Sequence, residues 1–454
     1  MRSQGSIVIG DPEATTAAAR EEALAAAGYR TAVACDPKAL PSLAAERRPD
    51  VALIGAFAAP FDALALCEAL RADPATAATP LVLTGAAASE MSPEARRRAL
   101  DIGVDDMLPA DSGAQELLAR LPRLVRAAVM QAELARRVET AAAFGRRVDP
   151  ADFSRDYAAR PRIMTVSETG GLLSDLQQVL LLAGFHALPE RSAYRAGERI
   201  DDERVDAAVI GLADAADLER AAALAAHIRA NARLFNLPTL IVGEAIGADD
   251  RARLYSAGAS IVWSGRAPLE DPEGLTAYLH MLVARQRRRW TLRDPFKATL
   301  GAETGDADLA GVYSPAFLRA HLARQISDAA AREADLTVAV LRIDNIAGVE
   351  ERHGAEAAHV LMQQMADWIA GMTRIEDAVG RLDADSFALL LPETPADEAE
   401  RVLQRLIGVL HQSEFHLTEE VMEPARVWPS AGIAARRPDD DADAQLARAA
   451  SVRY

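Results

Sequence analysis

Short apolar runs alternate with helix-length amphipathic segments through the first third of the chain, and this rhythm restricts the fold more than any other feature. The runs before residue 110 are SIVIG, YRTAVA, DVALIG, PLVLTG and DDMLP. Continuous apolar runs separated by helices are typical of parallel strands that are buried on both faces. We therefore predict a doubly wound α/β domain over residues 1–148. Its last segment, 117–147, is long enough to extend into a linker or a dimer face.

The same rhythm returns in the middle of the chain. The runs there are RIMTVS, DAAVIG, PTLIVG and SIVWS. VALIG at 51–55 aligns with AAVIG at 207–211, and a repeat at the length of a domain indicates a duplicated domain rather than a solenoid. The sequence therefore predicts a second doubly wound α/β domain at 160–292, followed by a polar linker.

The last third follows a different order of elements. We expect helices at 315–333, 354–371 and 395–411 and at the end of the chain, strands at 336–344 and 427–434, and a hairpin at 378–392. The turn of this hairpin falls near Asp383–Asp385. Strand, helix, hairpin, helix and strand in this order favour an α+β domain with a mostly antiparallel sheet, which we place at 306–454.

The charge balance excludes some classes of partner. Of the 50 basic residues all but Lys38 and Lys297 are arginine, and 67 acidic residues bring the net charge to −17. Binding to nucleic acid or anionic lipid needs a basic surface, so neither is expected, although a few arginines can still hold a small anionic ligand. The chain also has no apolar stretch long enough to span a membrane. With two cysteines and no signal-like start, it is expected to be cytoplasmic.

Both front domains resemble the receiver domains of response regulators. In that family an Asp after the third strand accepts phosphate, with an acidic pair binding Mg²⁺ and a Lys after the fifth strand. Here the acceptor position holds Gly55 in the first domain and Gly211 in the second. Asp11, Thr84 and Pro109 stand at the acidic, switch and lysine positions of the first domain. The resemblance implies that neither domain accepts phosphate. Asp11 and Thr84 are then loop-end polar groups on a retained scaffold.

Three segments in order resemble the GGDEF domain of diguanylate cyclases, which condense two GTP into cyclic di-GMP. They are LAGVYSPAFL (309–318), LRIDNIAGVEERHGAEAAHVL (341–361) and GRLDADSFALLLP (380–392). The family's functional positions are occupied here by Arg342, Glu350, His359, Asp383, Ala384, Asp385 and Ser386. A guanidinium at Arg342 cannot ligate Mg²⁺, and side chains at the usual glycines would crowd the nucleotide.

These replacements imply a GGDEF domain without catalytic residues, metal or cofactor. Asp385 keeps a carboxylate at a metal position, but alone it cannot organise two-metal chemistry. The other interpretation of Asp385 is a solvated residue of the hairpin turn. The final residues, AQLARAASVRY, also lack the family's terminal segment that contacts phosphate.

One feature of the family is intact. Its inhibitory product site, Arg-x-x-Asp, precedes the signature by five residues, and Arg374 and Asp377 keep this spacing to Asp383. An Arg fork suits guanine O6 and N7, and a carboxylate suits the N1/N2 edge. Arg405 matches the place where family members add a second Arg from a neighbouring domain. The alternatives are a surface ion pair for Arg374 and Asp377, and an exposed helix residue for Arg405.

The domain order resembles PleD-type response regulators, and the degenerate signature with an intact product site is most similar to PopA-type effectors. This resemblance implies a cyclic di-GMP receptor without enzyme activity, acting at a cell pole as an adaptor that helps deliver a cell-cycle regulator to a ClpXP-type protease. A homodimer is the expected assembly. Two other hypotheses stay open: a ligand-free scaffold whose domains serve only protein contacts, and a residual diguanylate cyclase.

Overall fold

The computed structural model describes residues 5–57, 62–89, 91–110, 112–153, 159–231, 234–244, 246–264, 271–419, 421 and 423–451. The chain forms two compact units. One, the parallel-sheet unit, combines the chain up to Ala128 with a later segment that ends at Trp290. The other, the antiparallel-sheet unit, combines the segment that begins at Val129 with the one that begins at Thr291. Among the described residues no helix is both long and apolar enough to cross a membrane.

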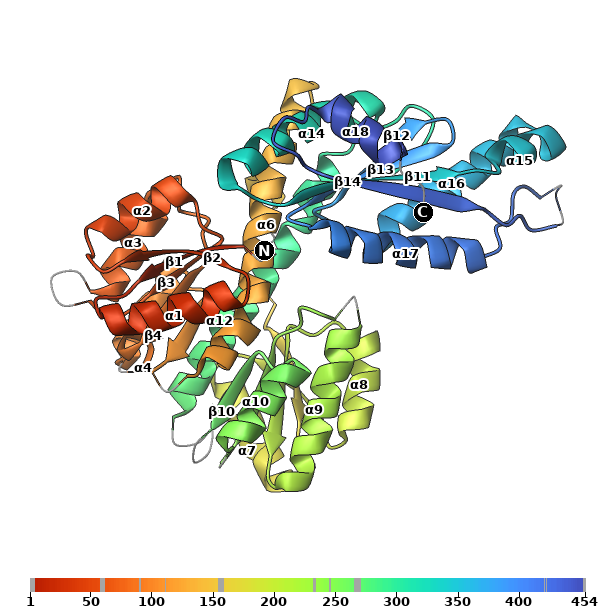
Figure 1. The fold of residues 1–454 in the computed structure, drawn as a ribbon. Coiled ribbons are helices and arrows are strands. Elements are labelled where there is room, and N and C mark those ends of the chain that lie inside the picture. Colours follow the sequence, from red (N-terminus) through yellow and green to blue (C-terminus); the bar gives the residue numbers. More distant parts are fainter. Residues whose placement is uncertain are drawn as a thin grey trace. The chain divides into compact units, whose positions relative to one another are not determined.

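The first sheet is fully parallel, with the strand order β2-β1-β3-β4-β5. Its strands are β1 (Ser6–Gly10), β2 (Arg30–Ala34), β3 (Val51–Ile54), β4 (Leu81–Gly85) and β5 (Asp106–Pro109). The helices are α1 (Ala14–Ala26), α2 (Ala39–Arg47), α3 (Ala63–Ala72), α4 (Ala86–Ser89), α5 (Pro93–Ile102) and α6 (Ala114–Ala143). The strand order reverses at β1, as in doubly wound folds, and helices lie on both faces of the sheet (Figure 1).

The second sheet repeats this order as β10-β9-β8-β6-β7, again fully parallel. Its strands are β6 (Arg162–Val166), β7 (His186–Glu190), β8 (Ala207–Leu212), β9 (Thr239–Gly243) and β10 (Ile261–Ser264). The helices are α7 (Gly170–Leu182), α8 (Ala193–Asp202), α9 (Ala215–Ala230), α10 (Ala248–Ala257) and α12 (Pro272–Thr291). Two parallel sheets of the same order are consistent with receiver-like domains. Strand β7 was not predicted, because it contains Pro189 and lies at the sheet edge, where a missing N–H is tolerated.

The third sheet is antiparallel, as predicted, with the order β12-β13-β11-β14. Its strands are β11 (Leu336–Ile343), β12 (Ala378–Asp383), β13 (Ser386–Pro392) and β14 (Pro429–Ala435). The helices are α13 (Arg293–Ala298), α14 (Pro315–Arg332), α15 (Ile346–His353), α16 (Ala355–Met372), α17 (Ala396–Gln412) and α18 (Ala442–Ser451). Side chains alternate along β11: Leu341 packs with α16 and α17, and Val340 packs with α14 and α18. Helix α15 was not predicted as a separate element.

Helix α6 contributes to both units. Its part before Val129 belongs to the parallel-sheet unit, and the remainder belongs to the antiparallel-sheet unit. In that second unit Leu134 packs with Phe296, and Ala141 joins the core that contains Phe317. The predicted continuation beyond the first domain is therefore a packed helix rather than a free linker. The predicted ranges of the three domains stay predictions. The structure divides into two compact units, and one boundary between them falls at Val129, inside α6, and not at a predicted domain end.

Candidate ligand site and the degenerate centres

The candidate ligand site is the loop between α16 and β12. Within this loop the backbone N–H of Arg374 donates to Oδ2 of Asp377 at 2.8 Å, and the N–H of Asp377 donates to the carbonyl of Arg374 at 3.1 Å. The two bonds close a tight turn. The turn leaves the Arg374 side chain exposed and the Asp377 side chain buried. The two predicted residues therefore lie together, with the guanidinium toward solvent and the carboxylate beneath it.

Burial changes the protonation of Asp377. It raises the pKa of this carboxyl to about 7, and the neighbouring carboxylate of Glu376, which is also buried, adds to the rise. The charges of Arg374 and Arg137 and the bond from the Arg374 N–H act in the opposite direction. Burial and Glu376 therefore favour the protonated form of this carboxyl more than in an exposed Asp.

Arg405 lies beside the same loop. It is exposed on α17, and its guanidinium donates to the carbonyl of Met372, the last residue of α16, at 2.9 Å. Met372 precedes Arg374 by two residues. The structure therefore brings all three predicted ligand residues to one place within the chain.

The position of the family's metal site is occupied by an ion pair. Arg342 on β11 stands directly opposite Ser386 on β13, and its Nε lies 3.8 Å from Oδ2 of Asp385. Ser386 is fully buried, and among the described residues its hydroxyl has no hydrogen-bond partner. Arg342 and Asp385, both predicted to stand at metal positions of the family, thus form an ion pair with each other.

The other degenerate positions do not converge on this pair. Glu350 on α15, His359 on α16, and Asp383 and Ala384 in the β12–β13 turn are all exposed. Within the described ranges, no group of three or more His, Cys, Asp or Glu side chains is arranged to hold a metal ion.

In the first parallel sheet an arginine pairs with Asp11, the residue predicted at the acidic position of the receiver family. Asp11 is buried, and its Oδ2 lies 2.5 Å from a guanidinium nitrogen of Arg20 on α1. Its Oδ1 accepts a bond from the backbone N–H of Glu13 at 2.9 Å. A Cβ atom placed on Gly55 would lie only 2.7 Å from the Asp11 Oδ2, so no side chain fits at the acceptor position without displacing Asp11. No pattern in the sequence pointed to Arg20.

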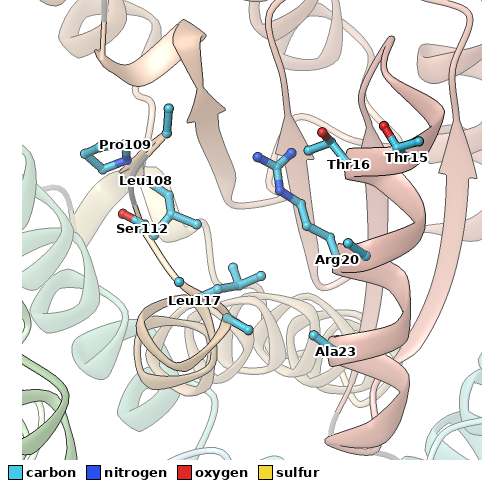
Figure 2. Close-up of a pocket in the computed structure, with 12 residues that line it drawn as sticks. Thr15, Thr16, Arg20, Ala23, Leu108, Pro109, Ser112 and Leu117 are labelled. Atoms are coloured by element: carbon cyan, nitrogen blue, oxygen red, sulfur yellow. The ribbon is translucent and has the colours of Figure 1, made fainter. Parts of the chain in front are cut away.

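A cavity of about 390 Å³ lies beside this centre, and Figure 2 shows residues that line it. Arg20 and Thr16 on α1 face Pro109 and Ser112 across it. Pro109, at the position of the family's Lys, therefore contributes an apolar ring to the wall instead of a cation. Thr84 is fully buried, and its hydroxyl has no hydrogen-bond partner in the part of the chain that the structure describes.

In the second parallel sheet a leucine lies at the predicted acceptor position. A Cβ atom on Gly211, near the end of β8, would come within 2.8 Å of Cδ2 of Leu172 on α7. An apolar side chain therefore covers the acceptor position. The last two residues of the segment GASIVWSGR, where the family has its Lys, lie outside the described residues, as do the last three of AQLARAASVRY.

The last sheet and its helices match a known family of domains. The family model of the diguanylate cyclase GGDEF domain matches residues 306–452. The last third of the chain has the GGDEF fold. One solved structure with this fold, the GGDEF domain of DgcB from Caulobacter crescentus in complex with c-di-GMP, is 19% identical with a TM-score of 0.32. It covers 34% of this chain and 88% of its own.

Similarity to one relative extends well beyond the GGDEF domain. Response regulator PleD of Caulobacter vibrioides is 24% identical over 439 residues, which cover 95% of this chain and 92% of PleD. Diguanylate cyclase DgcP of Pseudomonas aeruginosa is 27% identical over 146 residues, 32% of this chain and 21% of that protein. The chain is thus PleD-like over nearly its whole length, and its GGDEF relatives bear the names of enzymes.

Proposed function

We propose that the protein is a catalytically inactive receptor for cyclic di-GMP, with Arg374, Asp377 and Arg405 as ligand residues. The observation that carries the proposal is that these three residues lie together at the loop five residues before the degenerate signature. An exposed guanidinium offers a fork to guanine O6 and N7 or to phosphate, and a carboxylate beneath it accepts from the N1/N2 edge. A second arginine adds charge for a dianionic ligand.

Calorimetric titration with cyclic di-GMP tests the site directly. We expect the full chain to bind with micromolar or tighter affinity, and Arg374→Ala to weaken binding at least about 30-fold, the loss of a charge-assisted contact of about 2 kcal/mol. Arg437→Ala is a matched control, because the Arg437 N–H also donates to an Asp three residues later, at 2.7 Å, but away from the signature. Unchanged binding in Arg374→Ala would show that this loop is not the binding site for cyclic di-GMP.

The affinity should also depend on pH. Burial raises the pKa of Asp377 to about 7, so the carboxyl becomes protonated below this value and loses an acceptor for the guanine edge. We expect the affinity to rise about tenfold in all between pH 6 and pH 8, with most of the rise between pH 6 and pH 7. Titrations at pH 6, 7 and 8 measure this. Asp377→Asn should bind more weakly with a flat profile, and a flat profile in the unmodified protein would contradict the role of Asp377.

A residual diguanylate cyclase is the second candidate, since relatives with this domain bear cyclase names. The Arg342–Asp385 ion pair opposes it, because a fixed cation at the first metal position repels Mg²⁺. We expect no cyclic di-GMP from GTP and Mg²⁺, as followed by chromatography of the nucleotides. Product formation that is lost in Asp385→Ala would favour the enzyme.

The proposed output is recruitment of other proteins. Two receiver-like domains without phosphorylation chemistry can serve as contact surfaces, and we propose that ligand binding favours an arrangement that engages partners. By resemblance, these would belong to a ClpXP-type proteolysis pathway at a cell pole in the cytoplasm, with the receptor as a homodimer. Pull-down with and without cyclic di-GMP tests this. Partners retained equally in both conditions would favour a ligand-free scaffold instead.

A further inference from the structure

The second half of helix α6 touches the candidate ligand loop. Arg137 is buried near the end of this helix, and its guanidinium donates to the carbonyls of Ile375 at 3.2 Å and Glu376 at 2.6 Å. These are the two middle residues of the Arg374–Asp377 loop. The backbone of the ligand loop is therefore held by a side chain that is 238 residues away in sequence.

Arg137 is itself fixed from two other directions. Its Nε and one terminal nitrogen donate to Oε1 of Glu133, one helical turn earlier, at 3.2 and 2.9 Å. Its guanidinium lies over the ring of Phe296, 4.7 Å from the centroid. With both the ring and the carboxylate in place, the guanidinium presents its remaining N–H groups to the loop in one orientation.

Glu133 joins this arginine to the core of the antiparallel-sheet unit. Its carboxylate is fully buried, and it accepts bonds from the side chains of Gln325 and Arg136 and lies 2.7 Å from Nε2 of His321. Burial alone would raise the pKa of Glu133, but the charges of His321 and Arg137 outweigh it and hold the pKa well below its usual range. Helix α6 is thus attached to α14 through the ionised carboxylate of Glu133, which contacts His321 and Gln325 on α14.

The loop carbonyls and the ligand residues belong to one turn. The bonds that close this turn join Arg374 and Asp377 to each other, while Arg137 fixes the two carbonyls between them. A change in the position of α6 must therefore either break the charge-assisted bonds to the carbonyls or carry the turn with it. An arginine that served only to join α6 to α14 would need no bond to the loop.

Building on the proposed function, we infer that Arg137 is a positioning residue for the cyclic di-GMP site. It holds the Ile375 and Glu376 carbonyls so that Arg374 and Asp377 keep the geometry that the ligand requires. Because coupling between two sites is reciprocal, ligand binding in turn strengthens the docking of the end of α6 on the GGDEF domain. The site would then sense both the nucleotide and the state of this helix.

The test compares Arg137→Met with Arg136→Met in the full chain. Arg136 also bonds Glu133, and it pairs with Asp328 on α14, but among the described residues it makes no bond to the loop. We expect Arg137→Met to weaken cyclic di-GMP binding about 10- to 100-fold, and Arg136→Met to change it less than about threefold. In the unmodified protein the ligand should also slow amide hydrogen exchange in residues 133–143, and this protection should be absent in Arg137→Met.

A second variant separates a loss of binding from a loss of folding. Glu133→Gln combined with Arg137→Met removes both members of the buried Glu133–Arg137 ion pair, and it should fold yet bind as weakly as the single variant. Binding that is unchanged in both Arg137 variants, or ligand that leaves exchange in α6 unaltered, would overturn this inference alone. Absence of cyclic di-GMP binding by the unmodified protein would instead overturn the proposed function, and with it this inference.

Discussion

Replacing Glu133 with leucine is expected to destabilise the antiparallel-sheet unit by about 3–5 kcal/mol, the usual cost of removing one partner from a buried ion pair. The substitution leaves Arg137 buried without its carboxylate, and it removes the acceptor for Gln325 and the partner of His321. Native-state hydrogen exchange of the amides in β11 and β13, followed with increasing urea, measures the stability of this unit separately.

The neighbouring Glu139→Ala provides the control for this experiment. Glu139 forms an exposed ion pair with Arg324 at 3.4 Å, again between α6 and α14, and its loss should cost at most about 1 kcal/mol. If Glu133→Leu cost no more than Glu139→Ala, the buried carboxylate would not be the attachment point of α6.

The second large effect is expected in the parallel-sheet unit, from Arg120→Met. Arg120 on α6 is buried and donates to Asp106 Oδ1 and to the carbonyl of Met107, each at 2.9 Å, and to Glu116. It also donates to the Tyr255 hydroxyl on α10 at 3.1 Å, so one guanidinium joins the two receiver-like sheets. Without it Asp106 keeps Arg285 at 3.5 Å and Glu116 keeps the bond from the Tyr255 hydroxyl, but both buried carboxylates lose their nearest cation. We therefore expect a loss of about 3–5 kcal/mol in the free energy of unfolding.

Calorimetric and urea unfolding of the full chain can follow this change. Arg98→Ala is the matched control, since its bonds to Glu68 at 2.8 and 2.9 Å lie at the exposed surface and should contribute at most about 1 kcal/mol. Equal stability of Arg120→Met and Arg98→Ala would show that the two sheets are held together mainly by their apolar contacts.

Much of the fold was predictable from the sequence because buried parallel strands leave continuous apolar runs. Every strand of the first sheet lies within a predicted run. Strand β7 was missed for the same physical reason, since an edge strand needs only one apolar face and tolerates Pro189. The antiparallel sheet was predictable from the order of its elements, and the β12–β13 turn falls where Asp383–Asp385 indicated.

The site was predictable only in part. Spacing to the signature gave Arg374 and Asp377, and the position on the following helix gave Arg405. Arg20 and Arg137 were not found, because their roles depend on burial and on contacts across the fold. Glu133 and Arg137 form an i,i+4 pair that a sequence would suggest is a surface feature. Only the packing of α6 against Phe296 and the loop makes it a buried anchor.

Because α6 contributes residues to both compact units, it limits where the chain can be shortened without exposing a core. A shortened chain that starts at the predicted GGDEF domain would lack Leu134 and Ala141 and would expose the core around Phe317. It would also leave the buried His321 and Gln325 without the carboxylate of Glu133. A shortened chain that ends after the first sheet would carry this apolar and charged face into water. A domain exchange that preserves both cores would therefore have to keep α6 together with both of the units to which it contributes.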